Sequence, residues 1–140
     1  MIDRIEHDGM TLAIIIRSTY HADGIEFFTP DDYSQQLAYM NRPKGHRIKP
    51  HVHNRVERSV ALTQEVLFIR SGIVRVDFYD NSRTYVTDTI LERGDVILLA
   101  AGGHGFTMLE PTEMIEVKQG PYAGDQDKTL FQGKYDEPEG

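Results

Sequence analysis

Residues 66–79 read VLFIRSGIVRVDFY, two short apolar runs on either side of a turn that contains Gly72. In the second run, Val74, Val76 and Phe78 share one face, because successive side chains of a strand point to opposite sides. A glycine between two runs of this kind is typical of a tight turn between strands. The stretch therefore predicts two consecutive β-strands that bury one face in a core.

Similar short runs, rich in Ile, Val, Phe and Tyr, recur between turn residues along the rest of the chain. This spacing is typical of an all-β sandwich or barrel. Only residues 30–40 have any helical character, so we expect at most one short helix. The other predicted strands are Leu12–Arg17, Ile25–Phe28, Val96–Leu99 and Met114–Val117.

A chain of 140 residues suits a single domain. We place that domain at residues 1–132 and expect residues 133–140 to form a flexible acidic tail. No run approaches the roughly 18 apolar residues that a membrane helix needs. The first residues also lack the apolar core of a secretory signal, so a cytoplasmic location is expected.

The sequence contains no cysteine and carries a net charge of −7. Any metal must therefore be held by nitrogen and oxygen, and general affinity for nucleic acid is not expected. One stretch is nevertheless basic, with a single acid, Glu57, among its cations. This stretch either binds a small anion or is a solvated loop. Its cations are Arg42, Lys44, Arg47, Lys49, Arg55 and Arg58.

Two histidines, His51 and His53, lie two residues apart in this stretch. On a strand they would leave the same face and converge on one point. Two adjacent imidazoles are difficult to satisfy by ordinary packing, because protonation of both would bring like charges together. A shared metal ion gives both rings a common partner and keeps them neutral.

Two further residues are candidate ligands. Alternation places Glu65 on the same face as Leu67 and Ile69, where a carboxylate needs a cationic partner; the alternative is an exposed strand end. His104 lies between Gly103 and Gly105, which favours a close approach of the backbone to a site.

These residues resemble the two motifs of the cupin superfamily. The first motif is matched by Gly45, His51, His53, Glu65 and Gly72, and the second by Gly94, the turn Ala100-Ala101-Gly102 and His104. The resemblance implies a single-domain jelly-roll barrel, also called a double-stranded β-helix. It also implies one divalent metal ion, held by His51, His53, Glu65 and His104.

The chain departs from the family pattern at several points. Eleven residues separate His53 from Glu65, where the family usually has three or four, so a loop, Asn54 to Gln64, is inserted beside the site. Ala100 stands where a Pro is usual, and Met108 where an Asn is frequent. His104 also comes one residue early. The inserted loop is either a lid over the site or a dimer contact.

Nitrogen and oxygen ligands suit Fe, Mn, Ni or Zn. The resemblance implies a metal-dependent enzyme of the oxygenase or isomerase type that acts on a small anionic substrate. Two alternatives remain open: a non-catalytic small-molecule-binding cupin, and a metal-free sugar-nucleotide epimerase or isomerase with a His base and Tyr79 or Tyr122 as acid. We expect a homodimer. The expected substrate-binding residues are Arg47, Lys49, Arg55 and Arg58.

Overall fold

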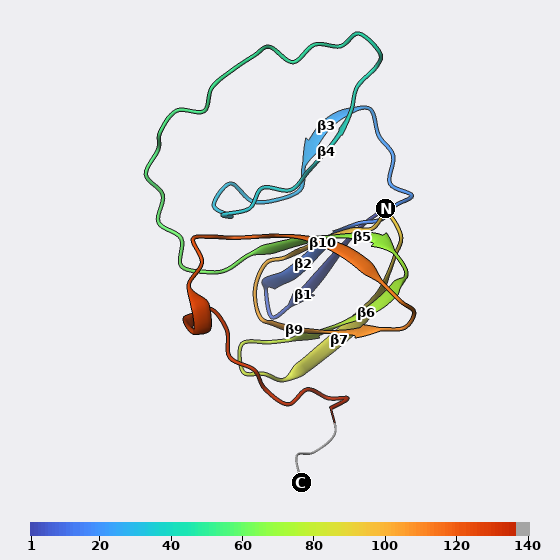
Figure 1. Cartoon of the computed structure of the whole chain (residues 1–140), viewed down its shortest axis with the longest axis vertical. Coiled ribbons are helices and arrows are strands. Elements are labelled where there is room, and N and C mark those ends of the chain that lie inside the picture. The colour runs from blue at the N-terminus through green and yellow to red at the C-terminus, as the bar shows by residue number, and fades with distance from the viewer. Residues whose placement is uncertain (137–140) are drawn as a thin grey trace.

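The computed structural model describes residues 1–136 and confirms the all-β prediction. The strands pair in antiparallel fashion, and the only helical element in these residues is a short 3-10 turn, η1 (Gly124–Gln126) (Figure 1). Each of the six predicted runs lies in or overlaps a strand. The strands are β1 (Ile2–His7), β2 (Met10–Ile16), β3 (Gly24–Phe27), β4 (Ala38–Asn41), β5 (Glu65–Ser71), β6 (Ile73–Tyr79), β7 (Tyr85–Glu92), β8 (Val96–Leu99), β9 (Gly103–Met108) and β10 (Glu113–Lys118).

Two sheets enclose the main core. One has five strands in the order β1-β2-β8-β5-β10, and the other has three in the order β7-β6-β9. Val74, Val76 and Phe78 are fully or almost fully buried between the sheets, as their alternation predicts. Leu67 and Ile69 meet them from β5 on the opposite sheet. The two sheets are therefore held together by apolar packing.

The sheets are not closed into a barrel. Within residues 1–136, strand pairing stays inside the five-stranded sheet, the three-stranded sheet and a separate hairpin of β3 and β4. In the described part of the chain, β9 is an edge strand that pairs with β6 alone. The structure therefore shows antiparallel sheets packed on each other, without the pairing that a closed jelly roll needs.

A second apolar cluster lies on the outer face of the five-stranded sheet. Ile14 and Leu98 of that sheet are covered by Phe28 and Leu37 from the segment that contains the β3–β4 hairpin. Residues 30–40, which alone had helical character in the sequence, form no helix, and this agrees with the expectation of at most one short helix. A turn follows Pro30 and the chain then enters β4, since the hairpin satisfies its backbone groups by pairing with β3.

Residues 42–63 form no strand, so the strand expected to carry His51 and His53 is absent. Every residue of this segment is exposed, and the segment arcs away from the sheets (Figure 1). In the described chain, its one backbone hydrogen bond is internal, from His46 N–H to the carbonyl of Pro43. The segment contains Pro43 and Pro50, which cannot donate to a sheet ladder.

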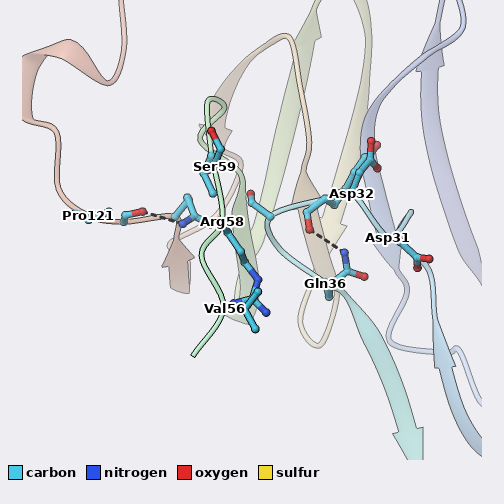
Figure 2. A pocket seen from close by; sticks show the side chains of 12 residues that line it. Asp31, Asp32, Gln36, Val56, Arg58, Ser59 and Pro121 are labelled. Atoms are coloured by element: carbon cyan, nitrogen blue, oxygen red, sulfur yellow. Dashed lines mark hydrogen bonds between the residues drawn. The ribbon is translucent and has the colours of Figure 1, made fainter. Parts of the chain in front are cut away.

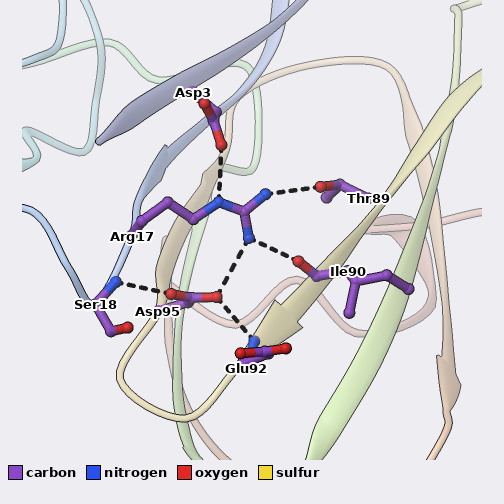
Figure 3. A network of polar contacts seen from close by, with 7 residues as sticks. All are labelled: Asp3, Arg17, Ser18, Thr89, Ile90, Glu92 and Asp95. Atoms are coloured by element: carbon purple, nitrogen blue, oxygen red, sulfur yellow. Dashed lines mark hydrogen bonds and ion pairs between the residues drawn. The ribbon is translucent and has the colours of Figure 1, made fainter.

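An ion pair joins the two sheets at one end (Figure 3). The Arg17 guanidinium bonds Asp3 at 2.7 Å and Asp95 at 3.2 Å, and it also donates to the Ile90 carbonyl and the Thr89 hydroxyl of β7. Asp3 and Arg17 belong to the five-stranded side, whereas Thr89 and Ile90 belong to the three-stranded side. The contact fixes the relative position of the sheets.

The C-terminal segment crosses the three-stranded sheet. Phe131 packs edge-on against Tyr79, with ring centroids 5.0 Å apart, and the Lys134 N–H donates to the Tyr79 hydroxyl at 3.0 Å. Tyr122 and Leu130 instead face solvent. Of the expected acidic tail, residues 133–136 lie against this sheet and residues 137–140 lie outside the described residues. No helix in the described part of the chain is long and apolar enough to cross a membrane.

Candidate functional site

A cavity of about 710 Å³ runs along β9. His104 and Phe106 lie opposite Phe78 and Val76 of β6, which places them on the core-facing side of the three-stranded sheet. The cavity also reaches the outer side of the same strand, where Gly105 leaves room. Its ionisable lining residues include Glu65, Asp77, Tyr79, His104, Asp127 and Lys128.

Two of the four expected metal ligands meet in this cavity. Glu65 is the first residue of β5, on the face of buried Leu67 and Ile69, as alternation predicts. His104 Nε2 lies 3.7 Å from Glu65 Oε2, and the two side chains are 28 % and 14 % exposed. A carboxylate and an imidazole thus converge from the two facing sheets at a largely buried position.

Glu65 also has a cationic partner that sequence reasoning missed. Lys118, its register partner on β10, places Nζ 3.5 Å from Glu65 Oε1 and 2.9 Å from Asp127 Oδ2. The hydrogen bond to Asp127 is the main reason why the pKa of Lys118 is raised, and Glu65 adds to it. The strand-like alternation of Met114, Glu116 and Lys118 was the available signal for this residue.

Asp127 ties the end of the inserted loop to the C-terminal segment. It accepts hydrogen bonds from Lys118 and from the Thr63 hydroxyl, and both lower the pKa of its carboxyl. Thr63 directly precedes Gln64, a buried residue whose carbonyl accepts from the Gln119 N–H. The loop is therefore anchored next to the cavity at its C-terminal end.

His104 is poised as a neutral imidazole. Burial lowers its pKa, and the nearby charges of Lys118 and Lys128 lower it further, although Glu116 acts in the opposite direction. A neutral ring keeps one nitrogen free to accept a proton or to bind a metal ion. The environment of His104 therefore suits either role.

The structure does not bring His51 and His53 to this cavity. Both are exposed on the irregular segment, with ring centroids 5.3 Å apart, and His51 Nδ1 lies 2.8 Å from the Lys49 carbonyl oxygen. Within residues 1–136, no three His, Asp or Glu side chains are grouped in a way that could hold a metal ion. The four expected ligands thus form two separate pairs, Glu65 with His104 and His51 with His53.

The expected substrate-binding residues are also apart from the cavity. Arg47, Lys49 and Arg55 are exposed on the same segment. Arg58 lines a second, open cavity of about 1040 Å³, together with Asp31, Asp32 and Val56 (Figure 2). The inserted loop therefore borders both cavities, because its Ala61, Leu62 and Thr63 line the first one.

Comparison with protein-family models, with curated proteins and with solved structures finds no match for this chain.

Proposed function

We propose that this chain is a small-molecule-binding protein of the cupin type that holds one divalent metal ion, Fe, Mn, Ni or Zn, and acts on a small anionic substrate. The observation that carries the proposal is the pair of Glu65 and His104 inside a cavity between two sheets. In this proposal the ion is bound by that pair together with His51 and His53. The reaction is of the oxygenase or isomerase type.

The chemistry of the pair supports a metal site. Carboxylate oxygen and neutral imidazole nitrogen are ligands shared by all four ions. Their approach from β5 and β9 makes the pair available to one ion in the cavity. When bound, such an ion would supply Lewis acidity at a substrate oxygen. Lys118 holds the other Glu65 oxygen and so orients the carboxylate.

Closure of the jelly roll is the second part of the proposal. In the described residues, one edge of β9 has no strand partner, and the backbone of residues 42–63 makes no hydrogen bond to the rest of the chain. The eleven residues between His53 and Glu65 span up to about 40 Å when extended. We propose that the histidine segment adds to the sheet beside β9 and brings both imidazoles to the pair.

The same movement would place the basic residues at the cavity. Arg47 and Lys49 precede His51 by four and two residues, so on a strand they would share its face. A guanidinium and an ammonium at the mouth of a cavity suit a carboxylate or phosphate group. This is the support for a small anionic substrate.

A metal-free reaction is the second candidate function. It is favoured because the pair of His51 and His53 lies apart from the pair of Glu65 and His104. His104 would act as general base from the core-facing side of the cavity and Tyr79 as acid from its outer side, because the cavity reaches both sides of β9. The Tyr79 hydroxyl accepts from the Lys134 N–H, which leaves its own proton free to be donated. Tyr122 is excluded from this role, since it is 96 % exposed and is not among the residues that line the cavity.

Elemental analysis of the purified chain separates the two candidates. The metal proposal expects close to one ion per chain, loss of that ion in Glu65→Gln/His104→Ala, and the same loss in His51→Ala/His53→Ala. His21→Ala is the matched control, because His21 is exposed and lies outside both pairs. A chain that takes up none of the four ions, even after reloading, would rule out the metal site and favour the metal-free candidate.

A further inference from the structure

An apolar surface on the five-stranded sheet remains uncovered. Phe68 of β5 lies opposite Ile115 of β10, and Val117 lies beside them on the same outer face. Their exposed fractions are 39 %, 50 % and 56 %. These three residues are named the sheet patch. Large aliphatic and aromatic side chains gathered on one outward face mark an interaction site rather than ordinary surface.

The other part of the same outer face is covered by a segment of the chain itself. Over β2 and β8, Ile14 and Leu98 are buried by Phe28 and Leu37 of the segment that carries the β3–β4 hairpin. The outer face is thus apolar from β2 to β10, but the chain's own segment protects only part of it. Val66 of β5 still packs against this cover. Phe68, Ile115 and Val117 lack an equivalent cover in the described residues.

The β3–β4 hairpin carries a second exposed apolar surface. Ile25 pairs with Met40 and Phe27 pairs with Ala38, so Ile25, Phe27 and Met40 share one face. Their exposed fractions are 43 %, 58 % and 48 %. Tyr39, on the opposite face, packs into the cluster over the sheet. Ile25, Phe27 and Met40 are named the hairpin patch.

We propose that these two patches bind each other between two copies of this chain, with the hairpin patch of each copy packed on the sheet patch of the other. One two-fold axis then relates both contacts, so the assembly closes as a dimer. The segment with the β3–β4 hairpin already covers part of the sheet in its own chain. In the dimer, the hairpin would also cover the sheet patch of the second copy. The proposal does not depend on metal binding.

The size of the surfaces supports a second copy as the occupant. A whole aromatic side chain contributes roughly 150–250 Å². Each copy contributes six large side chains that are about half exposed. Summed over both copies, they give on the order of 1,000 Å² of apolar surface, to which a polar rim would add. Stable dimers bury about 1,200–2,000 Å² in total, so the two patches supply the central part of such an interface.

Light scattering after size exclusion of the full chain tests the proposal with two single variants. Phe27→Glu changes only the hairpin patch and Ile115→Lys changes only the sheet patch. Wild type is expected to be a dimer, and each variant to weaken the dimer by roughly a hundredfold or more, because a charge is buried against apolar groups. The control Leu130→Ser, at an 85 % exposed position outside both patches, should remain a dimer.

A mixture of the two variants distinguishes this arrangement from other dimers. In a heterodimer, Glu at position 27 meets Lys at position 115 in one contact, and the other contact is entirely wild type. The mixture should therefore recover the dimer, and thermal melting of each variant shows that it is folded. A monomeric wild type, a dimeric Phe27→Glu, or a mixture that stays monomeric would overturn the proposal.

Discussion

Asp95 is the most fully buried anion of the network between the sheets. Its side chain is 5 % exposed, and its oxygens accept from the backbone N–H groups of Ser18 and Glu92, each at 2.8 Å, and from Arg17 at 3.2 Å (Figure 3). Three donors thus compensate the removal of one carboxylate from water. Charged groups buried in this way are costly to leave without their partner.

Replacing this carboxylate should strongly destabilise the protein. Asp95→Ala is expected to lower the free energy of unfolding by about 3–5 kcal/mol, since it removes the partner of Arg17 and of two backbone donors. Urea denaturation followed by circular dichroism measures the change. Asp125→Ala, at an exposed position, should change it by less than about 0.5 kcal/mol. A small effect at Asp95 would mean that water replaces the carboxylate at little cost.

The contact between Asp127 and Lys118 predicts a pH dependence of stability. The pKa of Asp127 is lowered in the folded chain, chiefly by Lys118 and next by Thr63. The stability that ionised Asp127 contributes to the fold is therefore fully present above the ordinary Asp pKa of about 3.9. It is lost as the pH falls through the lowered pKa of the folded chain. The Tm of wild type should exceed that of Asp127→Asn at pH 7, and the difference should shrink as the pH falls below about 3.9. A difference that is independent of pH would contradict this assignment.

At the scale of elements, the turn between β5 and β6 depends on glycine. Gly72 has φ +91°, and a Cβ there would overlap the Pro111 carbonyl oxygen and Thr112. Gly45 has a similar φ of +85° but open space around it. Gly72→Ala should therefore cost about 3 kcal/mol or more, whereas Gly45→Ala should cost only the backbone strain of about 1–2 kcal/mol. Urea titration measures the free energy of unfolding of both variants. Equal losses in the two would show that the overlap at position 72 is unimportant.

The C-terminal segment is held by a few aromatic and cationic contacts. Phe131 packs on Tyr79, the Arg75 guanidinium lies 4.2 Å from the centre of the Tyr135 ring, and Lys134 lies 4.1 Å from that of Tyr85. Phe131→Ala should lower the free energy of unfolding by about 1–3 kcal/mol and speed tryptic cleavage at Lys134. Leu130→Ala, its exposed neighbour, should do neither. Equal cleavage of the two variants would show that Phe131 does not anchor the segment.

At the scale of the whole molecule, residues 42–63 are the weakest point. Their backbone is exposed and is not bonded to the rest of the described chain, and they contain four trypsin sites that no proline follows. Trypsin should cut metal-free protein here before any other region, because locally open backbone is the preferred substrate. Under the proposed function, added metal should slow these cuts in wild type but not in Glu65→Gln/His104→Ala. Equal cleavage with and without metal would argue against closure of the segment.

Local alternation in the sequence determined much of the fold. Val74, Val76 and Phe78 were assigned to the core because period-two patterning is a property of neighbouring residues alone. The face of Glu65 followed in the same way from Leu67 and Ile69. Strands β1, β7 and β9 were missed, since polar residues and glycines interrupt their patterns. β4 was missed because residues 30–40 show only weak helical character, and pairing with β3 decided the conformation of residues 38–41.

Only the tertiary structure decided what surrounds the candidate site. Lys118 reaches Glu65 because β10 pairs with β5, although 52 residues separate them in the sequence. Asp127 joins them from a segment that carries no strand pattern, and His104 meets Glu65 across two different sheets. The spacing of His51 and His53 predicted that they lie side by side, but not where the pair lies in the fold. Such contacts depend on which strands pair and which edges remain free, and that is a property of the whole chain rather than of any short stretch.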